Sequence, residues 1–483
     1  MNIHMKAPIF FLAILPVLLL INSCKSSNLD ASNEMVNPNF DYTNYEPSNS
    51  DLVISRSGYA DKLYGFWLGQ NIANWTGLTT ELVRIGNIGE MQSGEFYTRE
   101  DWGAPTEPNY FGADYTWVSP TIGFVYVDAD SIWGSDDDTD MEYMYQHLLF
   151  TNETSVLTPD EIRGGWMHHI YSRKEESPFG TDRHGHARNF LWVSNQRALT
   201  LMETKELRPP HTGEPVNNEK FDMIDAQLTT EIFGLYAPAR PDVALRMGYL
   251  PVRTTAYENA AWIAEFYIIM HSLASRVDSN LPMKDQVFWM AEQAREHLPD
   301  HSYSAKMHDF VLSKYHEGVP WEEARDSIYV RYQIEEQDGF DVPSRSRCHG
   351  CFAAGLNYAA SLVSLFWGEG DFKETLKIAT LAGWDSDNPA ATWGGLLGFM
   401  IGKDGVEQAF DRTFSNKYNI HRTRRNFPND GMDTFENMAK IGVYVIDRVI
   451  QEELGGGIDL QNDLWYIPVN DDITFHFECH TKQ

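Results

Sequence analysis

Two short acidic motifs contain the residues of this 483-residue chain that are best suited to chemistry. The first is Ser-Asp-Asp-Asp-Thr-Asp at residues 135–140, and the second is Gly-Trp-Asp-Ser-Asp-Asn at residues 383–388. Adjacent aspartates repel one another, and a bound cation would relieve that repulsion. Oxygen ligands without paired Cys or His favour a hard ion, so we expect magnesium, with manganese or calcium as alternatives. Helix capping combined with surface charge is the other interpretation.

The elements that must position these motifs are predicted to be helices. Tyr59, Leu63, Phe66 and Trp67 form one apolar helical face, and Gly69 is expected to end that helix. Further helical segments are expected at Met141–Leu148, 258–275, 353–367, 372–382 and 389–401. Because no alternating strand series is present, we predict an all-α fold, a compact set of many helices with long aromatic-rich loops.

The segment that follows the second acidic motif has the composition of a buried helix. Asn388 suits the N-cap and Pro389 the first helical position. The small residues Gly394, Gly395 and Gly398 would let a neighbouring helix approach closely.

Taken in order along the chain, these features resemble the ADP-ribosylglycohydrolase family. The resemblance covers about residues 55–402: the helix near residue 59, the acidic run 136–139, Gly234 with nearby prolines, and the acidic pair at 385–387. It implies an all-α fold with a two-magnesium centre and hydrolysis of an N- or O-glycosidic bond in an ADP-ribosyl or related sugar substrate. Two metal ions can position a sugar and a water for attack on the anomeric carbon.

The resemblance also assigns site residues. The metal ligands it implies are Asp136, Asp137, Asp138, Asp385, Asp387 and Asn388. Glu81 matches the acidic residue that the family places near the substrate, and a carboxylate there could act as the catalytic base.

Three positions depart from the family pattern. Asp136 and Asn388 replace threonines, and Thr254-Thr255 stands where a Thr-His pair is common. These departures leave a metal site in place, and they extend the expected substrate from ADP-ribose to related sugars.

Aromatic residues between Glu81 and the first acidic motif suit a sugar-containing small molecule or glycan, because indole faces stack on sugar C–H groups. The candidates in and beside this stretch are Trp75, Trp102, Tyr110, Trp117 and Trp133. We expect about two of them to line a cleft and the others to pack in the core. Trp75, Trp102 and Trp117 are the predicted substrate-binding residues.

Composition limits the partners and the location. Lys and Arg number 38 against 69 Asp and Glu, a net charge of −31 that disfavours nucleic acid. Residues 1–23 have the charge and apolar run of an export signal, and Ile21 to Cys24 resemble a bacterial lipobox. We therefore expect lipidation at Cys24 and export to a bacterial membrane, the outer one, with the lipid as the only membrane contact. Residues 24–50 are expected to be a flexible tether, and 51–483 the hydrolase domain.

Two other functions and one other motif stay open at this point. A glycan-binding surface lipoprotein without enzymatic activity would share the aromatic content, but it gives no reason for the acidic motifs. The DDxxD spacing of Asp136, Asp137 and Asp140 also fits a helical isoprenoid synthase. Cys348 and Cys351 have CxxC spacing without a second pair, which favours a local disulfide or burial over a zinc site.

Overall fold

The computed structural model describes residues 35–182 and 185–469, and its architecture is helical, as predicted. The predicted signal peptide and Cys24 lie outside the described residues. The helices are α2 (Arg56–Gly77), α3 (Asp137–Thr151), α4 (Pro159–His169), α5 (Val193–Thr204), α6 (Ile232–Tyr236), α7 (Pro241–Val252), α8 (Glu258–Leu273), α9 (Met283–Arg295), α10 (Tyr303–His316), α11 (Trp321–Ile328), α12 (Val342–Arg345), α13 (Ala354–Gly368), α14 (Phe372–Leu381), α15 (Asp387–Phe410) and α16 (Phe435–Glu452). Short 3-10 turns lie at Arg99–Asp101, Ile224–Ala226, Gln337–Gly339 and Pro428–Gly431, and a π-helical turn, η3, spans Tyr329–Ile334.

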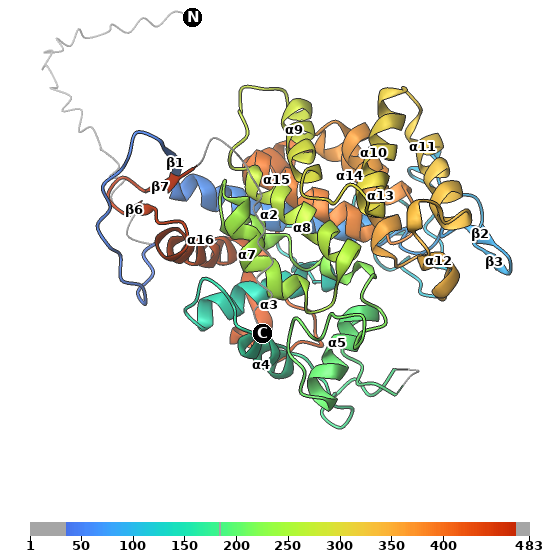
Figure 1. Cartoon of the computed structure of the whole chain (residues 1–483), viewed down its shortest axis with the longest axis horizontal. Coiled ribbons are helices and arrows are strands. Elements are labelled where there is room, and N and C mark those ends of the chain that lie inside the picture. The colour runs from blue at the N-terminus through green and yellow to red at the C-terminus, as the bar shows by residue number, and fades with distance from the viewer. Residues whose placement is uncertain (1–34, 183–184, 470–483) are drawn as a thin grey trace, which may run out of the picture.

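The strands are short, and two of the three sheets lie at opposite ends of the molecule (Figure 1). β1 (Asp51–Ser55), β7 (Leu464–Pro468) and β6 (Gly457–Asp459) form an antiparallel sheet in the order β1-β7-β6, with Asp51 opposite Pro468. The hairpin β2 (Asn87–Ile88) and β3 (Met91–Gln92) projects at the opposite end (Figure 1). A third pair joins β4 (Lys417–Asn419) to β5 (Met432–Thr434).

Helices α2 and α15 pack together along the centre of the molecule (Figure 1). A Cβ added at Gly69 would lie 2.3 Å from the carbonyl oxygen of Gly394, and one added at Gly398 would lie 2.3 Å from that of Gly65. The glycines therefore bring the two backbones into direct contact, and the prediction of a closely packed, buried helix after residue 389 is confirmed.

The expectation that Gly69 ends the first helix was wrong. Helix α2 continues to Gly77, and Gly69 lies in its interior against α15. Glycine often marks a helix C-terminus, but here the absence of a side chain serves interhelical packing.

Residues 35–50, the described part of the expected tether, lie against the folded body. The hydroxyl of Tyr42 donates a hydrogen bond of 2.7 Å to Asp447, and Arg56 donates one of 2.7 Å to the carbonyl oxygen of Met35. Arg56 and Asp447 also form an ion pair with both side chains fully buried. The packed part of the chain thus begins before residue 51.

Residues 78–136 contain only β2, β3 and one 3-10 turn, so the aromatic-rich stretch is a loop system. Within 35–182 and 185–469, none of the helices combines the length and the apolar character that a bilayer crossing requires.

Candidate metal centre

The second acidic motif forms the tight turn between α14 and α15. Gly383 has a φ of 96° and Trp384 a φ of 55°. The backbone of Trp384 is held from both sides, because its N–H donates to Arg84 and its carbonyl accepts from Leu82, each at 2.8 Å. A Cβ at Gly77 would lie 2.3 Å from the Cα of Asp387, so the end of α2 touches the start of α15.

The first acidic motif begins α3. Asp136 is the N-cap residue, and its carboxylate accepts a hydrogen bond of 3.0 Å from the N–H of Asp137. Asp136 therefore caps α3 through one of its two carboxylate oxygens. Asp140 forms a fully buried ion pair with Arg424, at 3.1 Å. This pairing argues against the isoprenoid synthase alternative, in which Asp140 would have to face the ion.

The two motifs meet in space, although about 250 positions separate them in the sequence. The side-chain amide of Asn74 in α2 donates to Asp138 at 3.2 Å and to Asp387 at 3.5 Å. Asn388 donates to Asp138 at 3.1 Å. One polar network therefore joins the starts of α3 and α15.

Asn388 has a different position from the one expected. Helix α15 begins at Asp387, and its N-cap residue is Ser386, which makes no side-chain capping bond. The side-chain oxygen of Asn388 accepts a hydrogen bond of 3.1 Å from Gln227, and its amide nitrogen faces Asp138. In this arrangement Asn388 joins the two motifs through its amide nitrogen, and its side-chain oxygen is bonded to Gln227.

The carboxylates form two groups that could hold metal ions. Oxygens of Glu81, Asp385 and Asp387 lie within 4.8 Å of one another, as do oxygens of Asp136, Asp137 and Asp138. The five aspartates are between 2% and 8% exposed. A hard divalent cation is bound by oxygen ligands of this kind.

Burial and mutual repulsion make these groups costly to ionise without a cation. Burial raises the pKa of Asp387 well above its usual value, and the nearby carboxylates of Glu81 and Asp138 raise it further. The same two causes raise the pKa values of Asp137, Asp138 and Asp385. One oxygen of Asp387 and the side-chain oxygen of Asn74 are buried without a hydrogen-bond partner among the described residues. A cation bound between these two oxygens would supply the missing partner for both.

Glu81 lies beside the second motif and is less buried than the aspartates. Burial raises its pKa to about 7, while a hydrogen bond from Tyr115 opposes the shift. One oxygen of the Glu81 carboxylate is buried without a hydrogen-bond partner among the described residues. A carboxyl group with a pKa near neutrality can exchange a proton at physiological pH.

Three residues of the site were missed by sequence reasoning, namely Asn74, Tyr115 and Gln227. Asn74 belongs to a set of amides, with Gln70 and Asn71, inside an otherwise apolar helix, and that pattern could have drawn attention to it. Tyr115 and Gln227 lie in irregular segments whose sequences carry no comparable signal.

The candidate aromatic residues divide into three groups. Trp75 donates from its indole to the carbonyl oxygen of Gly134 at 3.1 Å, next to the first motif, and its ring meets that of Trp117 edge to face at 5.9 Å. Trp117 is 70% exposed. Trp102 packs on Phe124, and Trp133 is fully buried in the core. Tyr110 lines a separate surface pocket of about 770 Å³.

Cys348 and Cys351 form a disulfide, so the preference for a local bridge over a zinc site is confirmed.

Comparison with known proteins identifies the family of this chain. The sequence matches the family ADP-ribosylglycohydrolase over residues 55–430. Since this match covers most of the chain, the protein belongs to the ADP-ribosylglycohydrolase family, a family of all-α hydrolases.

Among solved structures, one described as an "ADP-ribosylglycohydrolase-related protein complex" is similar. It shares 15% sequence identity and a TM-score of 0.44, and the alignment covers 81% of this chain and 99% of that chain. The comparison with curated proteins gives no match.

Proposed function

We propose that the protein is a magnesium-dependent hydrolase that cleaves an N- or O-glycosidic bond of an ADP-ribosyl or related sugar. The observation that carries this proposal is the bridging of Asp138 and Asp387 by Asn74, which unites two uncompensated acidic groups in one buried site. Five buried aspartates so close together suit one or two magnesium ions, with manganese as an alternative.

The residues that would hold the ions are those of the two acidic groups. Asp136, Asp137 and Asp138 would bind from the start of α3, and Asp385 and Asp387 from the start of α15. A bound divalent cation supplies positive charge that orients sugar hydroxyls and polarises a nearby water.

Glu81 is the proposed general base. Its carboxylate lies with Asp385 and Asp387, and it is the partly exposed member of that group. Burial raises its pKa in the metal-free site, and its place beside the proposed metal ligands would let it accept a proton from an attacking water. The hydroxyl of Tyr115 would hold the carboxylate in place.

Trp75 and Trp117 are the proposed sugar-binding aromatic residues. Trp75 is fixed to the segment that leads into the first acidic motif, and Trp117 extends from it into solvent. An exposed indole next to a buried polar site offers a flat apolar face to a sugar ring. Trp102, in contact with Phe124, would support this loop.

The proposal is tested by a hydrolysis screen of aryl glycosides and ADP-ribosylated substrates, with and without magnesium. We expect turnover of at least one substrate that EDTA abolishes and magnesium restores. Binding of a sugar without turnover, insensitive to EDTA, would favour the glycan-binding alternative and overturn the proposal.

The location is proposed on the sequence alone. The basic and apolar start followed by Cys24 supports export and attachment to a bacterial outer membrane through lipid on that cysteine.

A further inference from the structure

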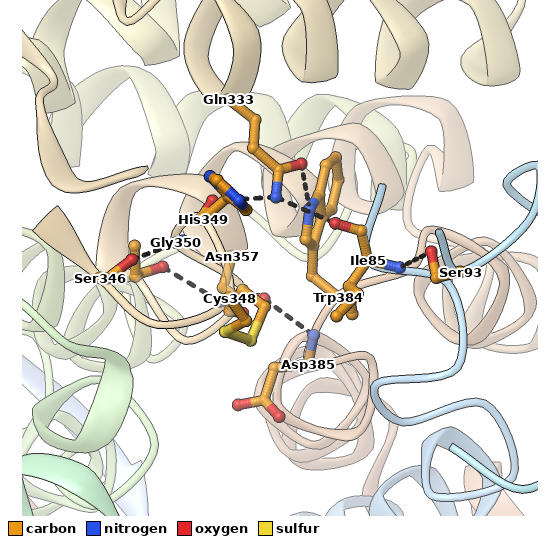
Figure 2. Close-up of a disulfide and its surroundings, with 12 residues drawn as sticks. Ile85, Ser93, Gln333, Ser346, Cys348, His349, Gly350, Asn357, Trp384 and Asp385 are labelled. Carbon is orange, nitrogen blue, oxygen red and sulfur yellow. Dashed lines mark hydrogen bonds between the residues drawn. A yellow bond between two sulfur atoms is a disulfide. The ribbon is translucent and has the colours of Figure 1, made fainter. Parts of the chain in front are cut away.

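The disulfide between Cys348 and Cys351 closes a tight turn between α12 and α13. The N–H of Cys351 donates to the carbonyl oxygen of Cys348 at 3.2 Å, and the N–H of Gly350 donates to the hydroxyl of Ser346 at 2.6 Å. Figure 2 shows this turn directly beside the second acidic motif, with Trp384 and Asp385 in contact with the residues around it.

Asn357, in the first turn of α13, connects the disulfide turn to Asp385. Its side-chain amide donates to the carbonyl oxygens of Cys351 and Ala353, each at 3.0 Å. Its side-chain oxygen accepts a hydrogen bond of 3.1 Å from the N–H of Asp385. Asn357 is fully buried, so these bonds do not compete with water.

Gln333, in the turn η3, makes a second connection. Its side-chain amide donates to the carbonyl oxygens of His349 and Ile85, each at 2.9 Å. Its side-chain oxygen accepts a hydrogen bond of 2.9 Å from the indole N–H of Trp384 (Figure 2). Two buried amide side chains therefore join the disulfide turn to two consecutive residues of the motif.

The backbone at this point needs such support. Trp384 has a φ of 55°, a region that a bulky side chain rarely adopts without help from its surroundings. The backbone of Asp385 is placed by the conformation of Trp384 and by the bond from its N–H to Asn357. Loss of the bonds from Gln333 and Asn357 would let the turn relax and would move Asp385 relative to Asp387.

We infer that Asn357 and Gln333 are positioning residues for the metal centre, and that the Cys348–Cys351 disulfide keeps them in place, so that reduction of this disulfide weakens cation binding. This inference rests on the proposed function, because it takes Asp385 to be a metal ligand. Residues that orient metal ligands typically change metal affinity by about 10- to 100-fold when they are removed.

Cys348 is 5% exposed and Cys351 is fully buried, so a small reductant would have to reach the disulfide through a surface pocket. Cys348 lines the 770 Å³ surface pocket together with Tyr110, Phe111, Arg347 and His349. In the reaction with a dithiol, the disulfide takes up two electrons and two protons and becomes two thiols. The dithiol gives up the same electrons and protons and becomes a cyclic disulfide.

The test is the affinity for Mg²⁺ alone, measured by titration calorimetry on the oxidised protein and on the protein reduced with a dithiol and kept anaerobic. We expect reduction to weaken Mg²⁺ binding by about tenfold and Asn357→Leu to weaken it by about 10- to 100-fold. The far-UV circular dichroism spectrum should not change.

Asn218→Leu is the matched control. Asn218 is also fully buried, and its amide donates to the carbonyl oxygens of Ser194 and Thr212 while its oxygen accepts from the N–H of Lys220. Removing it breaks the same types of bond away from the disulfide turn. We expect Asn218→Leu to lower the melting temperature and to leave Mg²⁺ affinity within about twofold of the parent.

Reducing the disulfide in the Asn357→Leu variant distinguishes a specific effect on the position of Asp385 from a general loss of stability. If the disulfide acts through Asn357, reduction should weaken binding much less in Asn357→Leu than in the parent. Equal Mg²⁺ affinity of the oxidised and reduced parent would overturn the inference and leave the proposed function intact. Absence of any divalent-cation binding to the oxidised parent would overturn the proposed function itself.

Discussion

Replacing Asp387 by asparagine tests whether the buried carboxylates destabilise the metal-free protein and bind a cation. The substitution keeps the size of the side chain and an oxygen that can accept the bond from Asn74, but it removes one negative charge. The oxygens of Asp387, Asp385 and Glu81 lie within 4.8 Å of one another, and two unit charges at that limit repel by about 3.5 kcal/mol at an effective dielectric constant of about 20. Proton uptake limits that penalty in the metal-free protein, so we expect Asp387→Asn to stabilise it by about 1–3 kcal/mol at pH 8.

The assay is thermal unfolding at pH 8, with EDTA and with excess magnesium. For a chain of this size, 1 kcal/mol corresponds to roughly 1 °C in the melting temperature. Metal-free Asp387→Asn should therefore melt about 1–3 °C above the metal-free parent. Magnesium at a hundredfold excess over its dissociation constant should stabilise the parent by about 2.7 kcal/mol, and this response should be largely lost in the variant.

Asp447→Asn is the control, because Asp447 is also buried but is paired with Arg56. Removing its charge leaves the buried guanidinium with only the longer ion pair to Asp463, at 3.7 Å, and we expect a destabilisation of about 3 kcal/mol with the magnesium response unchanged. The reasoning is refuted if Asp387→Asn lowers the metal-free melting temperature and keeps the magnesium response of the parent.

Three further predictions concern catalysis, pH and packing. Glu81→Gln should reduce kcat by about 10²–10⁴-fold with magnesium affinity changed far less, measured on any substrate that the parent cleaves; an unchanged kcat would remove Glu81 as the base. Burial lowers the pKa of His271 to about 4, so below pH 6.5 this residue binds a proton more readily in the unfolded chain. His271 should therefore contribute a loss of up to about 3 kcal/mol of stability between pH 6.5 and pH 4. Urea unfolding of His271→Gln should show a smaller loss, whereas the exposed His301→Gln should behave as the parent. Gly69→Ala should cost about 1–3 kcal/mol because its Cβ would meet the backbone of α15, whereas Gly164→Ala, with open space around its Cβ, should be neutral or slightly stabilising.

Much of the fold follows from local sequence patterns. The helices expected at 258–275, 353–367 and 372–382 match α8, α13 and α14 to within two residues, because each combines an apolar face with clear breaks such as Gly368-Glu369-Gly370. The start of α3 at the acidic run was also expected. Gly69 misled the prediction for α2 because a helix end and a helix-helix contact both favour glycine, and only the partner helix decides between them.

The site was predicted less completely than the fold. Its acidic residues could be found because carboxylates are unusual next to glycine-rich and apolar segments. Asn74, Tyr115 and Gln227 could not, because their roles depend on contacts between residues far apart in the chain, such as the bond between Gln227 and Asn388. The same is true of Asn357, which appears in the sequence as an ordinary polar residue near a helix start.

Other buried carboxylates of this protein have cationic partners or several hydrogen-bond donors, and this contrast explains why a cation is expected at the two acidic motifs. Asp140 pairs with Arg424, and Glu265 with Arg253. Asp225 has no cationic partner in the part of the chain that the structure describes, but it accepts three hydrogen bonds from Ser194 and Asn195. Among the described residues, Asp387 has neither a cationic partner nor several hydrogen-bond donors. The hydrogen bond to one of its oxygens is long, at 3.5 Å, and its other oxygen is buried without a partner. Since the fold supplies cations and donors to buried acids elsewhere, the acidic groups at the starts of α3 and α15 are best explained as ligands for a cation from solution.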